Sequence, residues 1–169
     1  MMNTPVEIER KYVILLPDIE VISREGGYTV SEIRQTYLLG APHVTHRVRM
    51  RTYPDRVVYT ETKKVRIDKL SAFEDEREID ADEYESLLSL RDPATVTLTK
   101  TRHTFTYFGQ TFEIDIYPEW QRTCIMETEL KDRAEKAEMP PFIRVLAEVT
   151  GDKKYSNASM SRGFPAELI

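Results

Sequence analysis

The most constraining feature of this sequence is an alternation of charged and apolar residues that returns in one segment after another. Successive side chains of a β-strand point to opposite faces, so Glu7, Glu9 and Lys11 share one face of the segment Glu-Ile-Glu-Arg-Lys. The same alternation places charge on one face at Arg47, Arg49 and Arg51, at Lys63, at Glu76 and Glu78, at Lys100 and Arg102, at Glu113 and Asp115, and at Glu127 and Glu129. The repetition predicts a sheet with one charged and one apolar face.

About eight such strands follow one another with mostly short connections, and eight antiparallel strands can close into a barrel without free edges. We therefore expect an α+β, mainly β protein: an eight-stranded antiparallel closed tunnel barrel with a charged interior, flanked by a few helices. No repeat or low-complexity linker divides residues 1–169, which predicts one domain. Helices are expected from Asp80 or Asp82 to Leu90, over 131–139, over 142–149 and over 156–162, with a loop at 67–73.

Composition excludes several classes of protein. The net charge of −5 argues against a general nucleic-acid surface. No apolar run approaches the roughly 20 residues that span a bilayer, and no signal peptide is visible, so neither a membrane nor an export role is expected. The single cysteine, Cys124, permits no internal disulfide and fits a core position in a cytoplasmic protein. His43, His46 and His103 have no zinc-ligand spacing.

A cavity lined by both signs of charge suits a ligand that combines anions with cations, such as a metal-chelated polyphosphate. Glu7 and Glu9 stand roughly 6.5 Å apart on an extended strand and can share a hard divalent cation. Lys11 can then meet a phosphate oxygen, and the arginines can clamp phosphates in a forked geometry. Charged strand faces exposed to bulk solvent are the competing interpretation, whereas a carrier of apolar ligands would need an apolar interior.

The chain resembles the CYTH domain, or triphosphate tunnel metalloenzyme, superfamily. The segment 7–11 fits the Glu-x-Glu-x-Lys signature of that family. Further matches are Arg49-Met50-Arg51, Thr62-Lys63, Glu76-Arg77-Glu78, Lys100-Thr101-Arg102, Phe112-Glu113-Ile114-Asp115, Glu127-Thr128-Glu129 and the late basic segment Lys153-Lys154-Tyr155. The resemblance implies a tunnel barrel, dependence on Mg²⁺ or Mn²⁺ and a triphosphate-containing small molecule as substrate. A homodimer is compatible with it, because members often pair.

The resemblance also implies roles for individual residues. Glu7, Glu9, Glu127 and Glu129 correspond to metal ligands, and Asp115 to a further acidic ligand. Glu76 and Glu78 correspond to acids that hold a second metal or a water. The phosphate clamp corresponds to Lys11, Arg49, Arg51, Lys63, Lys100 and Arg102, with Lys154 in the late basic segment. Lys100 and Tyr37 match a Lys-Tyr pair that takes part in chemistry in a bacterial tripolyphosphatase-like branch.

The function expected from this resemblance is metal-dependent hydrolysis of a triphosphate, with inorganic triphosphate first and nucleoside or thiamine triphosphate as further substrates. Trp120 is a candidate platform for a thiazolium ring. Two alternatives stay open. A class IV-type adenylyl cyclase would make cyclic AMP from ATP, although the His-Phe pair of such cyclases is absent from this sequence. A non-catalytic module would bind polyphosphate or nucleotides without turnover.

Overall fold

Antiparallel strands that surround a charged interior dominate the computed structural model, which describes residues 6–168. The strands are β1 (Val6–Leu15), β2 (Gly26–Tyr37), β3 (Thr45–Thr52), β4 (Val57–Arg66), β5 (Ser71–Ile79), β6 (Leu98–Tyr107), β7 (Gln110–Ile116), β8 (Thr123–Glu129) and β9 (Val145–Glu148). The helices are α1 (Ile19–Ile22), α2 (Ala81–Leu88) and α3 (Asn157–Met160), with a 3₁₀ turn, η1 (Lys153–Tyr155).

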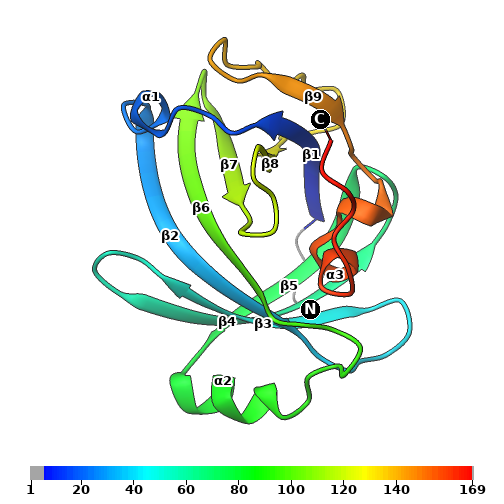
Figure 1. Ribbon diagram of the computed structural model, residues 1–169. Coiled ribbons are helices and arrows are strands. Elements are labelled where there is room, and N and C mark those ends of the chain that lie inside the picture. Colours follow the sequence, from blue (N-terminus) through cyan, green and yellow to red (C-terminus); the bar gives the residue numbers. More distant parts are fainter. Residues whose placement is uncertain (1–5, 169) are drawn as a thin grey trace.

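Eight of the strands form a ring. Neighbours follow the order β5-β4-β3-β2-β6-β7-β8-β1, and β1 returns to β5 through Val6–Ile8, which pair with Ser71–Phe73 (Figure 1). The predicted closed barrel is thus confirmed. The ninth strand, β9, was not expected and lies outside the ring, where it pairs with the second half of β1.

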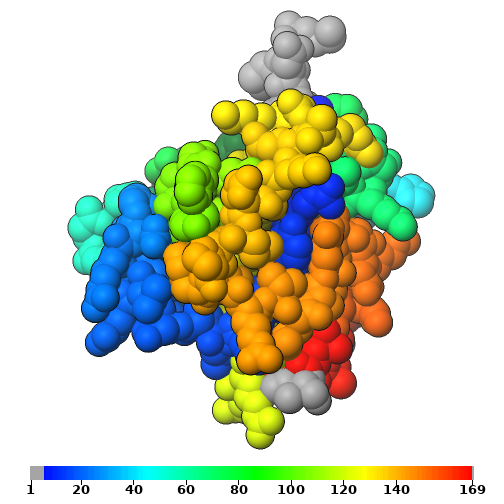
Figure 2. Space-filling view, turned by 90° about the horizontal axis from the view of Figure 1, so that it is seen from above, coloured from blue at the N-terminus to red at the C-terminus, as the bar shows by residue number. Residues whose placement is uncertain are grey.

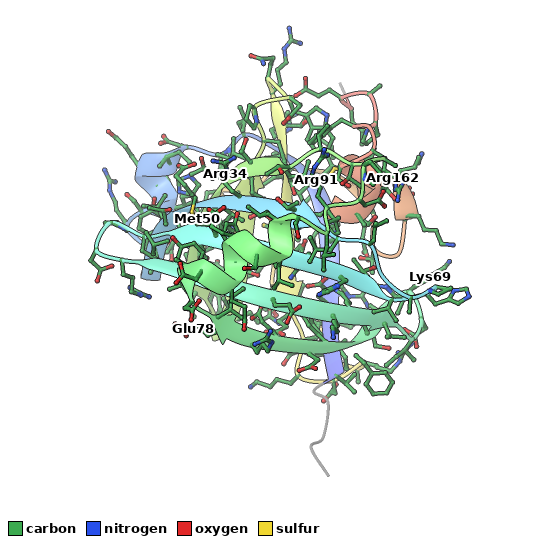
Figure 3. The ribbon with its side chains drawn as sticks, turned by 90° about the horizontal axis from the view of Figure 1, so that it is seen from below. Arg34, Met50, Lys69, Glu78, Arg91 and Arg162 are labelled. Carbon is green, nitrogen blue, oxygen red and sulfur yellow. The ribbon has the colours of Figure 1, made fainter. Side chains whose placement is uncertain are left out.

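Apolar side chains cover the outside of the ring and hold the helices against it. On one side, α2 packs over β3 and β4, with Leu38, Val48 and Tyr84 in a common core. Figure 3 shows α2 in front of this face, beside Met50. Asp80 caps α2, because its side chain accepts a hydrogen bond from the Glu83 amide at 2.8 Å.

A second apolar core lies on the outer face of β1, β6, β7 and β8. It contains Ile14, Phe105 and Phe112, with Cys124 fully buried as predicted, and it is covered by α1 and by residues 139–143. In the space-filling view of Figure 2, the yellow-to-orange segment that follows β8 covers much of the visible face beside the blue of β1. The apolar outer face is therefore shielded by the chain itself over these strands.

The interior is not charged throughout. At the end of the ring where β1 finishes and β8 begins, the inward side chains of Val13, Tyr117 and Ile125 are apolar and pack with Trp120 under η1 and α3. Trp120 is 6% exposed and donates to the Pro165 carbonyl, so its place is in this core and not beside a ligand. One end of the barrel is consequently filled, and the charged cavity occupies the rest.

Two expected helices were wrong. Residues 131–139 contain no helix, and residues 142–149 contain β9, whose Ala147 pairs with Val13. Backbone pairing with β1 outweighs the helical spacing of the apolar residues there. Residues 71–73, expected in a loop, begin β5, and α2 ends two residues before Leu90. Within residues 6–168, no helix is long and apolar enough to cross a membrane.

Candidate active site

The barrel encloses a cavity of about 470 Å³ that is lined mainly by charged and polar side chains. Nine of the residues that the sequence predicts for the site line it: Glu7, Glu9, Lys11, Tyr37, Arg49, Arg51, Glu76, Arg102 and Glu127. They come from β1, β2, β3, β5, β6 and β8, so the ring closure gathers residues that are far apart in the sequence. The charged faces therefore line a cavity and are not a solvated exterior.

Carboxylates and two lysine ammonium groups form the acidic centre of this cavity. Lys64 Nζ lies 3.1 Å from Glu7 Oε2, 3.8 Å from Glu9 Oε1 and 3.6 Å from Glu74 Oε2. Across the β1–β8 pair, Lys11 stands opposite Glu127, and Lys11 Nζ is 3.5 Å from Glu127 Oε1. Acids outnumber the lysines within reach by four to two, so the four carboxyl groups cannot all be ionised without further positive charge.

The crowding of these acids shifts their pKa values apart. Burial, Glu127 and Glu7 raise the pKa of Glu9 well above its ordinary value. Burial and a hydrogen bond with Glu7 raise the pKa of Glu74 to about 7. Burial opposes ionisation of Glu7 as well, but hydrogen bonding with Glu74 and the charge of Lys64 lower its pKa to about 2. Glu7 thus stays ionised and Glu9 retains its proton until positive charge arrives, whereas Glu74 is divided between its protonated and ionised forms near neutral pH.

Three arginines of β3 form a basic wall of the cavity, which meets the acids where Arg47 Nη2 lies 3.9 Å from Glu74 Oε1. Gln35 Oε1 accepts two hydrogen bonds from Arg49, from Nε at 3.1 Å and from Nη2 at 2.7 Å, and Arg51 Nε donates to Ser31 at 2.8 Å. Arg47 differs from both, because its Nε is buried without a hydrogen-bond partner among the described residues. A buried guanidinium donor that faces a cavity and lacks an acceptor is suited to an anionic oxygen.

Behind this wall lies a fully buried ion-pair network. Asp115 receives two hydrogen bonds from Arg102, from Nε at 2.7 Å and from Nη2 at 2.8 Å, and Lys100 Nζ lies 2.7 Å from its Oδ2. Burial, with the charges of Arg102 and Arg49, lowers the pKa of Lys100 to about 7 despite Asp115. Only Arg102 of these three lines the cavity. Lys100 and Asp115 therefore support Arg102 from behind instead of facing the cavity.

Four other predicted residues lie apart from the main cavity. Glu129 lines a smaller cavity of about 220 Å³ together with Glu7, Glu74 and Glu76. Lys63 is exposed on the outer face of β4 opposite Asp75, because the register of the β4–β5 hairpin turns Thr62 and Lys64 inward. Glu78 and Lys154 are also exposed and line neither cavity. Lys153, the neighbour of Lys154, lines the main cavity instead.

Lys64 was not expected in the cavity from the sequence, and Arg47 and Glu113, which also line it, were placed on charged faces without a role. The signal for Lys64 was available in the hairpin. Residues that face each other across antiparallel strands share a side of the sheet, so an inward Glu76 requires an inward Thr62 and hence an inward Lys64. Thr62 Oγ1 indeed donates to Glu76 Oε1 at 2.9 Å.

The donor set fits a divalent metal ion. Mg²⁺ and Mn²⁺ take oxygen ligands, and Mg²⁺ is usually held by one or two carboxylates together with substrate phosphates. Glu9 and Glu127 form a close carboxylate pair, and Glu7 Oε2 is buried without a well-directed hydrogen bond among the described residues. Within that same part of the chain, no three His, Cys, Asp or Glu side chains are already arranged around one point. The residues therefore suit an ion that shares its coordination with a ligand.

Known proteins with this architecture are found among solved structures. The inorganic triphosphatase NE1496 is 26% identical to this chain, covers 98% of both chains and superposes with a TM-score of 0.59. The fold and this similarity are consistent with a member of the CYTH, or triphosphate tunnel metalloenzyme, superfamily. Searches against models of protein families and against curated proteins find no match.

Two further solved structures show how widely this fold is shared. The Pyrococcus horikoshii protein PH1819 is 24% identical over 75% of this chain and 80% of its own length, with a TM-score of 0.56. HpAC1 from Hippeastrum, for which a dominant triphosphatase activity is described, is 13% identical over 74% and 80%, with a TM-score of 0.50. Identities this low relate these proteins by fold, so the assignment of a function must come from the cavity.

Proposed function

We propose that this protein is a divalent-metal-dependent hydrolase of triphosphate-containing substrates, with inorganic triphosphate as the preferred one. The observation that carries the proposal is the division of the cavity into two walls. Arg47, Arg49 and Arg51 line one wall, whereas Glu7, Glu9 and Glu127 line the other. A chain of phosphates with a bound cation presents complementary charge to both walls at once.

In this proposal the basic wall binds and orients the phosphates. The unpartnered Nε of Arg47 donates to a phosphate oxygen, and Arg49 and Arg51, fixed by Gln35 and Ser31, donate to its neighbours. Lys100 is a positioning residue, because it acts on the cavity only through Asp115 and Arg102. Spreading negative charge over several donors stabilises the transition state of phosphoryl transfer.

Tyr37 supplies a directed proton. Its hydroxyl oxygen accepts a hydrogen bond from Gln35 Nε2 at 2.6 Å, and Arg47 stands opposite it on β3. With its oxygen occupied as an acceptor, the hydroxyl proton is left to donate into the cavity. We assign it to an oxygen of the phosphate that leaves when water attacks the neighbouring phosphorus and the bridging P–O bond breaks.

The acidic wall is assigned to the metal and the water. Glu7, Glu9 and Glu127 would hold the ion, which when bound neutralises phosphate charge and orients substrate. Glu74 and Glu76 stand next to them on β5. With a pKa near 7, Glu74 can accept the proton of an attacking water at neutral pH.

The test is release of phosphate from inorganic triphosphate, ATP and thiamine triphosphate, each with Mg²⁺, with Mn²⁺ and with EDTA. We expect metal-dependent turnover that is fastest with inorganic triphosphate. Formation of cyclic AMP from ATP would support the cyclase alternative, and tight binding of triphosphate without any product would support a non-catalytic module. The absence of turnover with all three substrates and both metals would reject the hydrolase.

A further inference from the structure

Three cations that the proposed chemistry does not use stand at the entrance of the cavity: Arg66, Lys69 and Lys153. All three line the main cavity and are exposed. Arg66 follows Lys64 by two residues on β4 and shares its face, so the entrance cations extend the basic lining outward. Figure 3 places Lys69 at the opposite end of the β4–β5 hairpin from Glu78.

The entrance is built by two segments that pack closely. A Cβ at Gly151, whose φ is +74°, would lie 2.8 Å from Lys69 Cβ and Cγ, so the turn that carries Lys69 sits directly on this glycine. Asp68 holds the turn, since it accepts hydrogen bonds from the Leu70 amide at 2.9 Å and from Arg133 at 2.8 Å. Lys153 follows two residues after Gly151, which fixes the entrance cations around one opening.

The entrance cations differ from the inner ones in their charge balance. Inside the cavity, Lys11 and Lys64 each lie within 4 Å of a carboxylate. Among residues 6–168, no ion pair involves Arg66, Lys69 or Lys153. Asp152, the lining acid that precedes Lys153 in the sequence, accepts a hydrogen bond from the Lys154 amide at 3.1 Å. The opening is thus a net positive surface that continues into a site for phosphates.

The lining near this opening also lacks a surface for an aromatic ligand. Among the described residues that line the cavity, Tyr37 is the sole aromatic, and it lies inside on β2 next to the arginine wall. The residues around the entrance are otherwise small or polar, such as Thr45 and Ser156. Such a surface offers charge to an anion but no stacking partner to a base or a thiazolium ring.

We infer that the entrance cations form an outer subsite for the additional phosphates of a linear inorganic polyphosphate longer than triphosphate. The inference rests on the proposed function, because it assumes that the inner cavity holds the first phosphates of the same chain. It extends the substrate class from triphosphate to longer chains and gives them the higher affinity. The polyphosphate enters at the positive opening, and its outer phosphates make contacts with the entrance cations that a triphosphate does not reach.

Calorimetric titration in EDTA, with chain length checked by phosphorus NMR, tests this with inorganic triphosphate, inorganic tetraphosphate and ATP. We expect tetraphosphate to bind wild type at least about fivefold more tightly than triphosphate, since exposed charge pairs each contribute modestly. The double variant Lys69→Gln/Lys153→Gln should lose this preference, and Arg66→Gln should reduce it. The charge-matched control Lys63→Gln/Lys154→Gln should keep it, because neither side chain lines the cavity.

Each outcome decides one question. Equal affinity of wild type for the two chains, or the same loss of preference in the control, would overturn the outer subsite. If the double variant weakened the binding of ATP as much as that of tetraphosphate, the assignment of the outer subsite to polyphosphate chains would be overturned, because ATP carries only three phosphates. Preferential binding of tetraphosphate without phosphate release would reject the hydrolase and keep the subsite. Phosphate release without a preference for the longer chain would keep the hydrolase and reject the subsite.

Discussion

Lys100 Nζ lies 2.7 Å from Asp115 Oδ2 in the wall of the barrel, and the two side chains are 0% and 2% exposed. Asp115 also holds Arg102 through both carboxylate oxygens. Two positive groups thus depend on a single buried carboxylate, and one of them faces the substrate cavity. The pair links the stability of the barrel to the geometry of its proposed phosphate site.

We expect Asp115→Asn to destabilise the protein strongly. The amide is nearly isosteric but cannot neutralise Lys100 and Arg102, and removing one partner of a buried ion pair typically costs about 3–5 kcal/mol. The free energy of unfolding from urea titration measures this loss. Glu113→Gln is the matched control, because Glu113 Oε2 also accepts from Arg102, at 2.9 Å, but its side chain is 33% exposed. A similar loss in both variants would contradict the special weight given to Asp115.

The lowered pKa of Lys100 predicts a pH dependence of stability. Its pKa is about 7 in the folded protein and near 10.5 in the unfolded chain, so between these values the unfolded chain binds the extra proton. The resulting stability is complete above pH 10.5 and is lost as the pH falls toward 7. Lys100→Met removes this contribution. The free energy of unfolding of wild type minus that of Lys100→Met should therefore rise with pH over this window, by at most about 1.4 kcal/mol per pH unit. A difference that does not change with pH would contradict the lowered pKa of Lys100.

The sequence predicted the barrel because its signal is a period of two that recurs on eight strands. The alternation from Glu7 to Lys11 and from Arg47 to Arg51 fixes which face is charged, and a ring is the arrangement that hides such a face. What it could not predict is β9. Residues 142–149 have helical spacing, and they form a strand only because the second half of β1 offers an unpaired edge once the ring has closed.

The predicted site residues also divide into those whose placement follows from strand alternation and those whose placement does not. Those on strands with unbroken alternation, such as Glu9, Arg49 and Glu127, line the cavity as expected. Lys63 and Lys154 were misplaced by one residue each, because a slip of one position inverts the side to which a strand or turn residue points. Asp115 has the alternation of a lining residue, but bulky Arg102 lies between it and the cavity, which is a matter of packing that spacing does not encode.

The neighbours Lys63 and Lys64 offer a matched pair for testing the phosphate site. Lys64→Gln should raise the KM for triphosphate by about tenfold or more, because the acids around Lys64 lose their neutralising charge and repel phosphate from the cavity. Lys63→Gln removes the same charge from the outer face and should change the KM by less than about twofold. Steady-state phosphate release at saturating metal measures both. A larger effect at Lys63 would show that β4 presents its other face.

The proposed metal ligands predict a stabilisation that is independent of turnover. A ligand that binds only the folded state stabilises it by about 2.7 kcal/mol at a hundred times its Kd, so Mn²⁺ should raise the Tm of wild type by several degrees. Glu9→Gln should abolish most of this shift without lowering the Tm in EDTA, because Glu9 has a raised pKa and glutamine imitates its protonated form. Glu78→Gln, on the exposed end of β5, should keep the full shift. Differential scanning calorimetry with Mn²⁺ and with EDTA separates these cases. An unchanged shift in Glu9→Gln would show that the ion, if it binds, does so elsewhere than at the β1–β8 carboxylates.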